Sequence, residues 1–353
     1  MKEKVIVSYV TEHPIEGDAP RVMVYTDDTT SKRYKVEFYD RDLGSLLYTD
    51  YVMQNQWISA KRQWFTNWLI KVYNGSGELI HTDIFNLEGK TVFIKFDAYA
   101  MGDNIAWIPY VEEFRKKHKC NVICSTFWNQ LFAGKYSDIL FVEPNIKVQN
   151  VYAQYYIGTH NQLNKIYQPS LYLNNPLQKI ASDILGLEYK EINPELNLYF
   201  GNRKKKKQVV ISEYASLKVK EWNVPGGWQS VVDLFREKGY DVIVISKEYS
   251  YLKNVINKSG DLPIINRIID ILESEYYIGN SSGLSWLAWA LGVPVILISD
   301  FTPPYHEFQN NCYRIYNTLY TRHEIKYEEV MHPVNISQVK NYIENIFSKK
   351  KYN

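Results

Sequence analysis

The pattern of apolar and polar positions changes near Gly89. Before it, short runs alternate between the two kinds of residue, as in strands with one face in a core and the other in solvent. A hairpin is predicted at Gly75-Ser76-Gly77. Residues 1–90 are therefore predicted to form a small antiparallel β-rich domain, with strands at RVMVYT, YKVEFYD, SLLYTD, NWLIKVYN and ELIHTDIF.

After Gly89 the apolar runs become nearly continuous, as in parallel strands that are buried on both faces. A loop from Asp97 to Asp103 is predicted to precede an amphipathic helix over Asn104–His118, and a second helix is predicted over 177–186. Strands that alternate with helices indicate a doubly wound α/β domain over 91–190. Its strands are predicted at TVFIKF (91–96), NVICST (121–126), SDILFVE (137–143) and VYAQYYIG (151–158).

The same alternation returns after a polar stretch at 159–176 and predicts a second α/β domain over 191–353. Its strands are predicted at QVVISE (208–213), DVIVIS (241–246), YYIG (276–279) and VPVILIS (293–299), and its helices at 226–238, 266–274, 284–291 and in NISQVKNYIENIFSKKK. Open parallel sheets bind ligands at the carboxyl ends of their strands. The predicted fold class is α/β, with two doubly wound, Rossmann-like domains facing a cleft. That arrangement suggests a GT-B glycosyltransferase without fixing the reaction.

The amino-acid composition limits which binding partners and which cellular compartment are expected for this chain. The net charge of the 353-residue chain is only +2, so no overall field recruits nucleic acid, and RKKKK at 203–207 is interpreted as a solvated loop. No apolar run is long enough for a signal peptide or a membrane span, which favours the cytoplasm. The three cysteines, Cys120, Cys124 and Cys312, are expected to be small buried hydrophobes and not metal ligands.

The turn after the YYIG strand is the first candidate site. Asn280, Ser281, Ser282, Gly283 and Leu284 lead from a strand into a helix. The free N–H groups and the positive end of the dipole at a helix N-terminus suit a phosphate group. Ordinary N-capping by Ser281 or Ser282 explains the same residues equally simply.

The segment after the TVFIKF strand contains two carboxylates. Gly102 permits a tight turn, and Asp103 stands where a helix is predicted to start. Asp103 is either the N-cap of that helix or a general base that takes a proton from an acceptor hydroxyl. Asp97 competes for the role of base, although it follows the strand so closely that it can equally anchor the loop.

The third candidate segment follows the QVVISE strand and contains Ser212, Lys218, Lys220 and Trp222. A lysine here could neutralise a departing diphosphate, or both lysines could be ordinary surface residues. Trp222 could form the wall of a pocket or belong to the core. Walker and Gly-x-Gly-x-x-Gly motifs are both absent from the sequence.

Three motifs taken together resemble the heptosyltransferases, which are inverting GT-B enzymes with an ADP-heptose donor. They are MGDNIAWIPYVEEFRKKH, the sequence Lys220-Glu221-Trp222 with GGW after it, and YIGNSSGLSWLAWALGVPVILIS. Within that group the chain is most similar to the bacterial autotransporter O-heptosyltransferases, which glycosylate serines of secreted adhesins. The resemblance covers nearly the whole chain.

The resemblance implies a role for each candidate. Asp103 matches the catalytic base, on an acceptor-side loop with Asp97, Gly102 and Asn104. Donor binding is implied for Lys220 at the phosphates, for the turn Ser281, Ser282, Gly283 and Leu284 at the diphosphate, and for Glu248 at the adenosine ribose. Ser212 and Trp222, in the segment after the QVVISE strand, are predicted to bind the donor as well. The family's helix start usually has Asp-Thr-Gly in the lipopolysaccharide enzymes, whereas this chain has Ser-Ser-Gly.

One departure changes what the resemblance implies. The autotransporter enzymes have an iron-binding finger of four cysteines near the C-terminus, and this chain has only Cys312 in that half. The prediction is a metal-independent inverting transferase, without a cofactor, that moves a heptose from an ADP-sugar to a Ser or Thr of a protein such as an adhesin. Two alternatives stay open: another nucleotide sugar transferred to a surface glycan, and a non-catalytic nucleotide- or carbohydrate-binding protein. An oligomer is possible.

Overall fold

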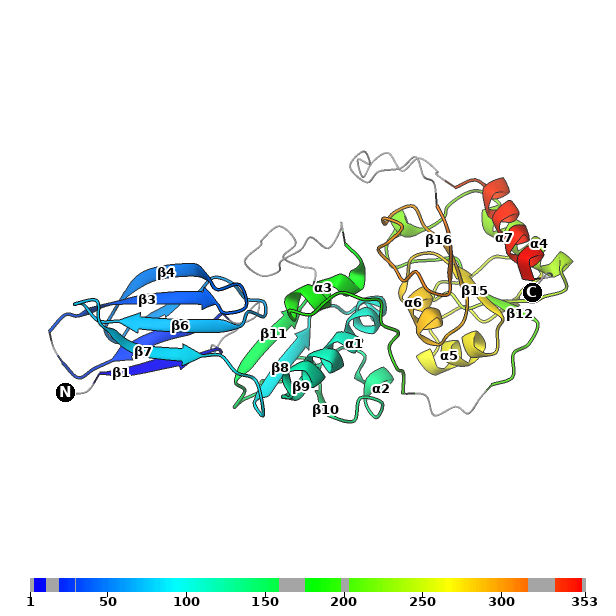
Figure 1. Ribbon diagram of the computed structural model, residues 1–353. Helices are drawn as coiled ribbons and strands as arrows, with labels where there is room; N and C mark the ends of the chain where they lie inside the picture. The colour runs from blue at the N-terminus through cyan, green and yellow to red at the C-terminus, as the bar shows by residue number, and fades with distance from the viewer. Residues whose placement is uncertain are drawn as a thin grey trace. The chain divides into compact units, whose positions relative to one another are not determined.

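The computed structural model describes residues 3–10, 19–28, 30–158, 175–197, 203–316 and 334–350 (Figure 1). These residues divide into two compact units. The first lies within Met1–Ala98, Trp107–Tyr172 and Gln178–Lys190, and the second within Tyr99–Ala106, Leu173–Leu177 and Glu191–Asn353. Most of the predicted polar stretch at 159–176 lies outside the described residues. No helix among the described residues is both long and apolar enough to cross a bilayer.

The N-terminal segment is antiparallel, as predicted, and contains two sheets. One has the order β4-β3-β6-β7 and the other β1-β2-β5. Alternation along the strands puts Val36, Phe38, Ile70 and Val72 inside, each with no exposed surface. The strands are β1 (Lys4–Ser8), β2 (Arg21–Tyr25), β3 (Arg33–Asp40), β4 (Ser45–Met53), β5 (Trp57–Ser59), β6 (Trp68–Tyr73) and β7 (Leu79–Ile84), of which β1 and β5 were not predicted.

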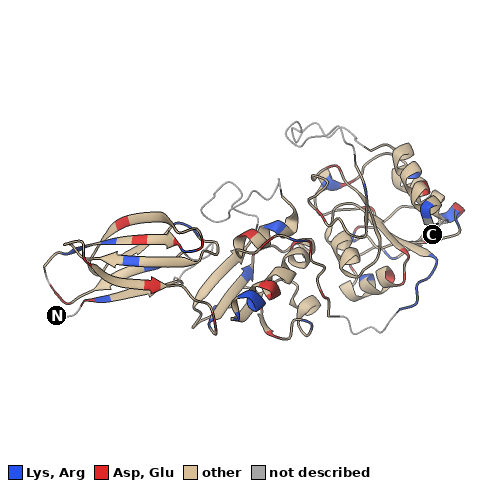
Figure 2. Cartoon of the chain, in the orientation of Figure 1, with Lys and Arg blue, Asp and Glu red and all other residues tan. Residues whose placement is uncertain are grey.

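Charged side chains of both signs are spread over these strands, as Figure 2 shows. The basic run at 203–207 lies just ahead of β12 (Gln208–Ser212) and is tied to the protein at several points. Arg203 and Lys206 both form ion pairs with Glu273, and Lys205 donates a hydrogen bond to the Ser274 carbonyl. All five residues are exposed and lie outside any helix or strand, so the run is a solvated loop, as predicted, and these partners hold it in place.

The first parallel sheet has the order β10-β9-β8-β11. Its strands are β8 (Thr91–Phe96), β9 (Asn121–Ser125), β10 (Ile139–Val142) and β11 (Ala153–Ile157), all of which were predicted. Helix α1 (Met101–His118) follows β8 in the sequence, the unpredicted α2 (Asn129–Phe132) follows β9, and α3 (Leu177–Ile184) comes after β11. Val92, Phe93 and Ile94 are consecutive and all buried, as in a strand covered on both faces.

The second parallel sheet has six strands in the order β14-β13-β12-β15-β16-β17. Numbered along the chain, that is the order 3-2-1-4-5-6 of a dinucleotide-binding fold. After β12 the strands are β13 (Asp241–Val244), β14 (Ile256–Asn257), β15 (Tyr276–Gly279), β16 (Val295–Ile298) and β17 (Cys312–Ile315). The two-residue β14 and the edge strand β17 were not predicted.

Helices cover both faces of this sheet. Val231 and Phe235 of α4 (Gly227–Glu237) and Val339 and Ile343 of α7 (Ile336–Lys350) share one core cluster with buried strand residues such as Val242. Figure 1 shows α5 (Ile264–Leu272) and α6 (Gly283–Ala290) on the opposite face. The second unit is therefore doubly wound, as predicted.

Helix α1 differs from its prediction in two ways. It begins at Met101 and not at Asn104, because the Asn104 N–H already bonds the Ala100 carbonyl at 3.3 Å. It is also buried on nearly every side from Gly102 to Val111 and becomes amphipathic only near its C-terminus. Asp103 therefore lies inside the first turn and is not the N-cap.

Candidate functional site

The candidate site lies where the strand order of the second unit reverses. Strands β12 and β15 are adjacent and parallel, with Ser212 opposite Gly279. The chain leaves β12 toward β13 on one side and leaves β15 toward β16 on the other. Such a switch point opens a crevice at the carboxyl ends of the strands, and ligands of open α/β sheets bind there.

The turn after β15 is an N-terminal capping box. The Ser282 hydroxyl accepts a hydrogen bond from the Ser285 N–H at 3.5 Å, and the Ser285 hydroxyl accepts one from the Ser282 N–H at 3.1 Å. The capping interpretation of Ser282 is therefore correct. Gly283 and Leu284 occupy the first two helical positions, where an N–H has no acceptor within the helix. These two N–H groups and the helix dipole are what the turn offers an anion.

Ser281 has a different environment from its neighbour. It is only 4% exposed, and its hydroxyl donates a 2.6 Å hydrogen bond to the carboxylate of Glu307. A hydroxyl has one proton to donate, and this one is committed to Glu307. The Ser281 side chain therefore connects the turn to Glu307 and is not presented to a ligand in this structure.

Asn280 joins this turn to the loop after β12. Its fully buried side chain accepts a hydrogen bond from the Trp222 N–H at 3.0 Å and donates one to the Glu213 carbonyl at 2.8 Å. Trp222 itself belongs to the core: it is 5% exposed, packs against Trp228 and donates from its indole to the Val334 carbonyl. The alternative in which Trp222 belongs to the core is thus the correct one.

The two lysines of the loop after β12 are not equivalent. Lys218 is exposed and forms a 3.1 Å ion pair with Glu221. Lys220 is half-buried, its ammonium lies 5.7 Å from the centre of the Phe301 ring, and no carboxylate of the described residues forms an ion pair with it. Lys220 is therefore the cation that an incoming anion could engage without breaking an existing ion pair.

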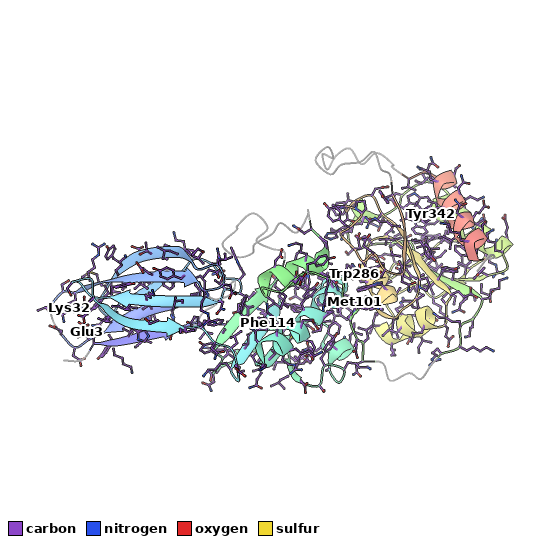
Figure 3. The ribbon with its side chains drawn as sticks, viewed as in Figure 1. Glu3, Lys32, Met101, Phe114, Trp286 and Tyr342 are labelled. Carbon is purple, nitrogen blue, oxygen red and sulfur yellow. The ribbon has the colours of Figure 1, made fainter. Side chains whose placement is uncertain are left out.

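The start of α1, which belongs to the second unit, packs against the start of α6 through two glycines. A Cβ on Gly102 would lie 2.8 Å from Cδ1 of Trp286, and one on Gly283 would lie 3.1 Å from Cβ of Met101. Figure 3 labels Met101 and Trp286 at this contact. The face of Gly283 on which a side chain would stand is therefore directed at Met101.

Asp103 lies in the same first turn of α1, and its pKa differs from that of an ordinary aspartate. Burial raises its pKa to about 6, while the positive charge of Lys220 acts in the opposite direction. Lys220 is thus close enough to influence the carboxylate. A pKa near 6 leaves the group ionised at neutral pH and still basic enough to accept a proton.

The other acceptor-side candidates differ from Asp103. Asp97 belongs to the first unit, where its carboxylate lies so close to Gly158 that no Cβ would fit there, and its N–H bonds the Ile157 carbonyl. Asp97 thus anchors the end of β8 against β11. Asn104 is fully buried and its amide donates to the Ala100 carbonyl at 2.8 Å, which gives it a structural role.

Two donor-side candidates remain. Ser212 ends β12, is 1% exposed, and lies opposite Gly279 at the switch point. Glu248 is exposed in the loop after β13, and its charge acts on both Tyr214 and Lys218. Glu248 therefore stands beside the loop after β12, at the carboxyl edge of the sheet.

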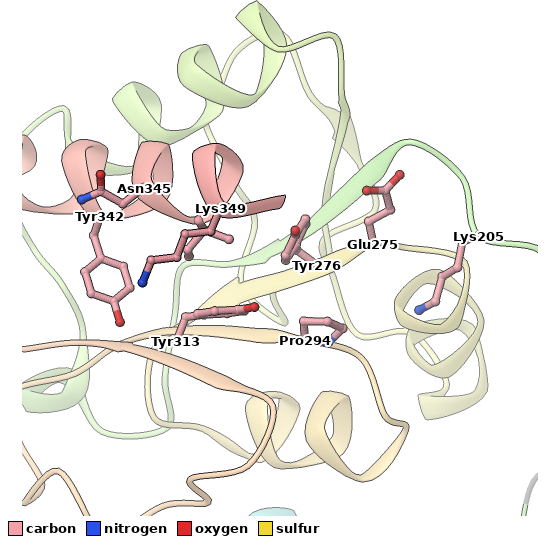
Figure 4. Close-up of a pocket in the computed structure, with 9 residues that line it drawn as sticks. Lys205, Glu275, Tyr276, Pro294, Tyr313, Tyr342, Asn345 and Lys349 are labelled. Carbon is pink, nitrogen blue, oxygen red and sulfur yellow. The ribbon is translucent and has the colours of Figure 1, made fainter. Parts of the chain in front are cut away.

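A separate pocket of about 630 Å³ opens at the other edge of this sheet (Figure 4). Tyr276 begins β15, Pro294 directly precedes β16 and Tyr313 is near the start of β17, so the pocket lies at the amino ends of the strands. Lys349 of α7 lines it as well. None of the predicted site residues lines this pocket.

No family model matches the chain. Over 298 residues the chain is 30% identical to the autotransporter heptosyltransferase Aah of Escherichia coli, across 81% of the chain and 76% of Aah. The chain belongs to the autotransporter heptosyltransferase family. Another protein of this kind, the inactive autotransporter heptosyltransferase BimC of Burkholderia thailandensis, is 31% identical over 274 residues, which are 74% of the chain and 64% of BimC.

Solved structures show the fold of this family member. The iron-containing dodecameric glycosyltransferase TibC of enterotoxigenic E. coli aligns with a TM-score of 0.84 at 23% identity, over 98% of this chain and 96% of TibC. The ADP-heptose lipopolysaccharide heptosyltransferase II of E. coli aligns with a TM-score of 0.50 at 11% identity, over 74% and 99%. The fold is therefore GT-B, as predicted, with an added N-terminal antiparallel part.

The residues of this chain do not fit a four-cysteine iron site. The sequence has three cysteines, with Cys120 and Cys124 buried in the first unit and Cys312 on β17 of the second. Within the described ranges, no three His, Cys, Asp or Glu side chains gather as metal ligands.

Sequence reasoning assigned no role to two residues of the site, Asn280 and Glu307. A buried asparagine directly after a strand is a signal that could have pointed to Asn280, since its amide must find partners. Glu307 lies 26 positions after Ser281, and nothing in its local sequence relates it to the turn.

Proposed function

We propose that the chain is an inverting sugar transferase that moves a heptose from an ADP-heptose donor to a Ser or Thr hydroxyl of a protein acceptor. The observation that carries the proposal is the meeting, in one unit, of Asp103, Lys220 and the start of α6. A base, a cation and the backbone N–H groups of a helix start are the parts that displacement of a nucleoside diphosphate by a hydroxyl needs.

In the proposed reaction, the Asp103 carboxylate takes the proton of the acceptor hydroxyl. The acceptor oxygen then forms a bond to the anomeric carbon of the sugar, while the bond from that carbon to the diphosphate oxygen breaks. The electron pair leaves with the nucleoside diphosphate, and attack from the opposite side inverts the anomeric configuration. Lys220 and the N–H groups of Gly283 and Leu284 stabilise the negative charge that develops on the leaving group.

The family and the site chemistry support ADP-heptose as the donor. TibC has been crystallised in complex with ADP-D-β-D-heptose, and the present chain aligns with that structure at a TM-score of 0.83. We propose that the diphosphate binds at Ser281–Leu284 and Lys220, with the nucleoside toward Glu248 and Ser212. We also propose that transfer needs no metal ion, because charge neutralisation is assigned to Lys220 and the helix start.

A non-catalytic nucleotide-binding role is the second candidate, because a relative at 31% identity is described as inactive. Donor turnover separates the two. Purified protein is incubated with ADP-heptose, ADP-glucose, UDP-glucose and GDP-mannose, and the release of nucleoside diphosphate is followed with and without a candidate acceptor. We expect acceptor-stimulated release from ADP-heptose. Binding of a nucleotide sugar without any release would instead support the non-catalytic role.

A further inference from the structure

A fully enclosed carboxylate lies beneath the proposed diphosphate turn. Glu307 is 2% exposed and lies in the loop between β16 and β17. One carboxylate oxygen accepts hydrogen bonds from the Ser281 hydroxyl at 2.6 Å and from the Thr302 hydroxyl at 2.7 Å. The other oxygen is paired with Arg314 of β17. The carboxylate therefore connects the turn after β15 with the loop after β16 and with β17.

Arg314 keeps this carboxylate ionised. Burial alone would raise the pKa of Glu307, but the charges of Arg314 and His306 and the two hydroxyl donors outweigh it and lower the pKa to about 2. Arg314 also donates to the Thr302 carbonyl at 2.9 Å, which fixes its own position. At any working pH the Ser281 hydroxyl thus meets a charged acceptor, and such hydrogen bonds are stronger than neutral ones.

The Glu307–Arg314 pair places no net negative charge next to the turn. A bare carboxylate so close to a diphosphate would repel it, whereas the Glu307–Arg314 pair has no net charge. The carboxylate can therefore hold Ser281 without reducing the attraction that Lys220 and the helix dipole exert on an anion. A preformed turn also loses less conformational freedom when a ligand binds.

We propose that the Glu307–Arg314 pair is a positioning element for a nucleoside diphosphate, acting through the Ser281 hydroxyl on the turn whose backbone N–H groups bind the phosphates. The inference rests on the proposed function, because it concerns the same turn. Glu307 touches no reacting atom, and its effect passes entirely through Ser281. It follows that the phosphates, and not the nucleoside, should respond to a break in this connection.

The test compares the binding of ADP and of adenosine by calorimetry in three variants. Ser281→Ala removes the connection to the turn and leaves no buried charge unpaired, because Arg314 and Thr302 still contact Glu307. Thr302→Ala is the matched control, since it removes a hydrogen bond to the same oxygen from a residue outside the turn. Ser281→Thr keeps the hydroxyl and serves as the conservative replacement.

We expect Ser281→Ala to weaken ADP binding by about 3- to 10-fold, as the loss of one hydrogen bond predicts, and to leave adenosine binding unchanged. Thr302→Ala and Ser281→Thr should bind ADP nearly as the wild type does. The positioning role is overturned if Ser281→Ala binds ADP normally, if it loses ADP and adenosine equally, or if Thr302→Ala weakens ADP as much. If the wild type binds none of ADP, GDP and UDP, the proposed function fails as well.

Discussion

At the scale of single residues, Asp103 is subject to two opposing effects. Burial raises its pKa to about 6, and Lys220 lowers it. If Asp103 is the base, only its ionised form can accept the acceptor's proton. The acidity of one side chain should therefore set the lower limit of the working pH range.

We predict that kcat/KM for the donor falls as the pH drops through about 6, because kcat/KM reports the acidity of the free enzyme. Asp103→Asn should reduce turnover by about 100- to 10,000-fold and should abolish this pH dependence. Because the pKa is raised in the folded state, ionisation of Asp103 costs stability as the pH rises through 6. Asp103→Asn should therefore melt no lower than the wild type at neutral pH. A pH–rate profile and thermal melts check both statements, and near-normal turnover of Asp103→Asn would refute the assignment.

Lys220 and Lys218 provide a matched pair for the next prediction. Lys218→Met should change activity little, because Lys218 is exposed and already paired with Glu221. Lys220→Met should raise the donor KM, lower kcat, and shift the acidic limb of the pH–rate profile upward, since Lys220 lowers the pKa of Asp103. Steady-state kinetics of both variants measure this. Equal, small effects would mean that Lys220 is an ordinary surface lysine.

At the scale of elements, the close contact between the starts of α1 and α6 depends on glycine. A Cβ on Gly102 would lie 2.8 Å from the Trp286 ring, a distance that side chains do not tolerate without movement. Overpacking of this kind costs about 1–3 kcal/mol. The contact also keeps Asp103, the next residue, beside the second unit's turn.

We predict that Gly102→Ala lowers kcat strongly and the melting temperature only slightly, because the added methyl group displaces the start of α1 and so acts directly on Asp103. Gly75→Ala is the control: a Cβ there meets only the Arg33 carbonyl, at 3.7 Å, in the β6–β7 hairpin. Kinetics and thermal melts are compared for the two variants. A Gly102→Ala enzyme with wild-type kcat would show that this contact does not position the base.

Some elements could be predicted from sequence and others could not, for physical reasons. Strands β8, β12 and β15 were found because burial on both faces gives a continuous apolar run. The start of α1 was missed because Asp103, a common N-cap residue, directly precedes the predicted helix, whereas the Asn104 N–H bonds Ala100 instead. The edge strand β17 was missed because CYRI has only one buried residue, Ile315.

At the scale of the whole molecule, the site depends on contacts between residues far apart in sequence. The local motifs indicated Asp103, Lys220 and the turn at 281–284 as candidates, because each follows a strand. They could not show that Asn280 connects the turn to Trp222, 58 positions away, or that Arg314 neutralises Glu307. Such polar networks follow from the strand order β12-β15-β16-β17, which no single segment encodes.

The metal content is also a property of the whole chain. We predict that the purified protein contains no stoichiometric iron and that its transfer activity survives EDTA, because three cysteines in separate places cannot form a four-cysteine site. Elemental analysis of the protein, with an iron-containing relative such as TibC as the positive control, tests this. One tightly bound iron per chain would contradict it.

The activity proposed for this chain is sugar transfer with Asp103 as the base. The most direct measurement is the intact mass of an autotransporter acceptor after incubation with ADP-heptose and either the wild type or Asp103→Asn, both shown to bind ADP equally. We expect heptose additions on Ser or Thr with the wild type and almost none with the variant. Equal additions with both proteins, or an unchanged acceptor with a wild type that binds ADP-heptose, would contradict it.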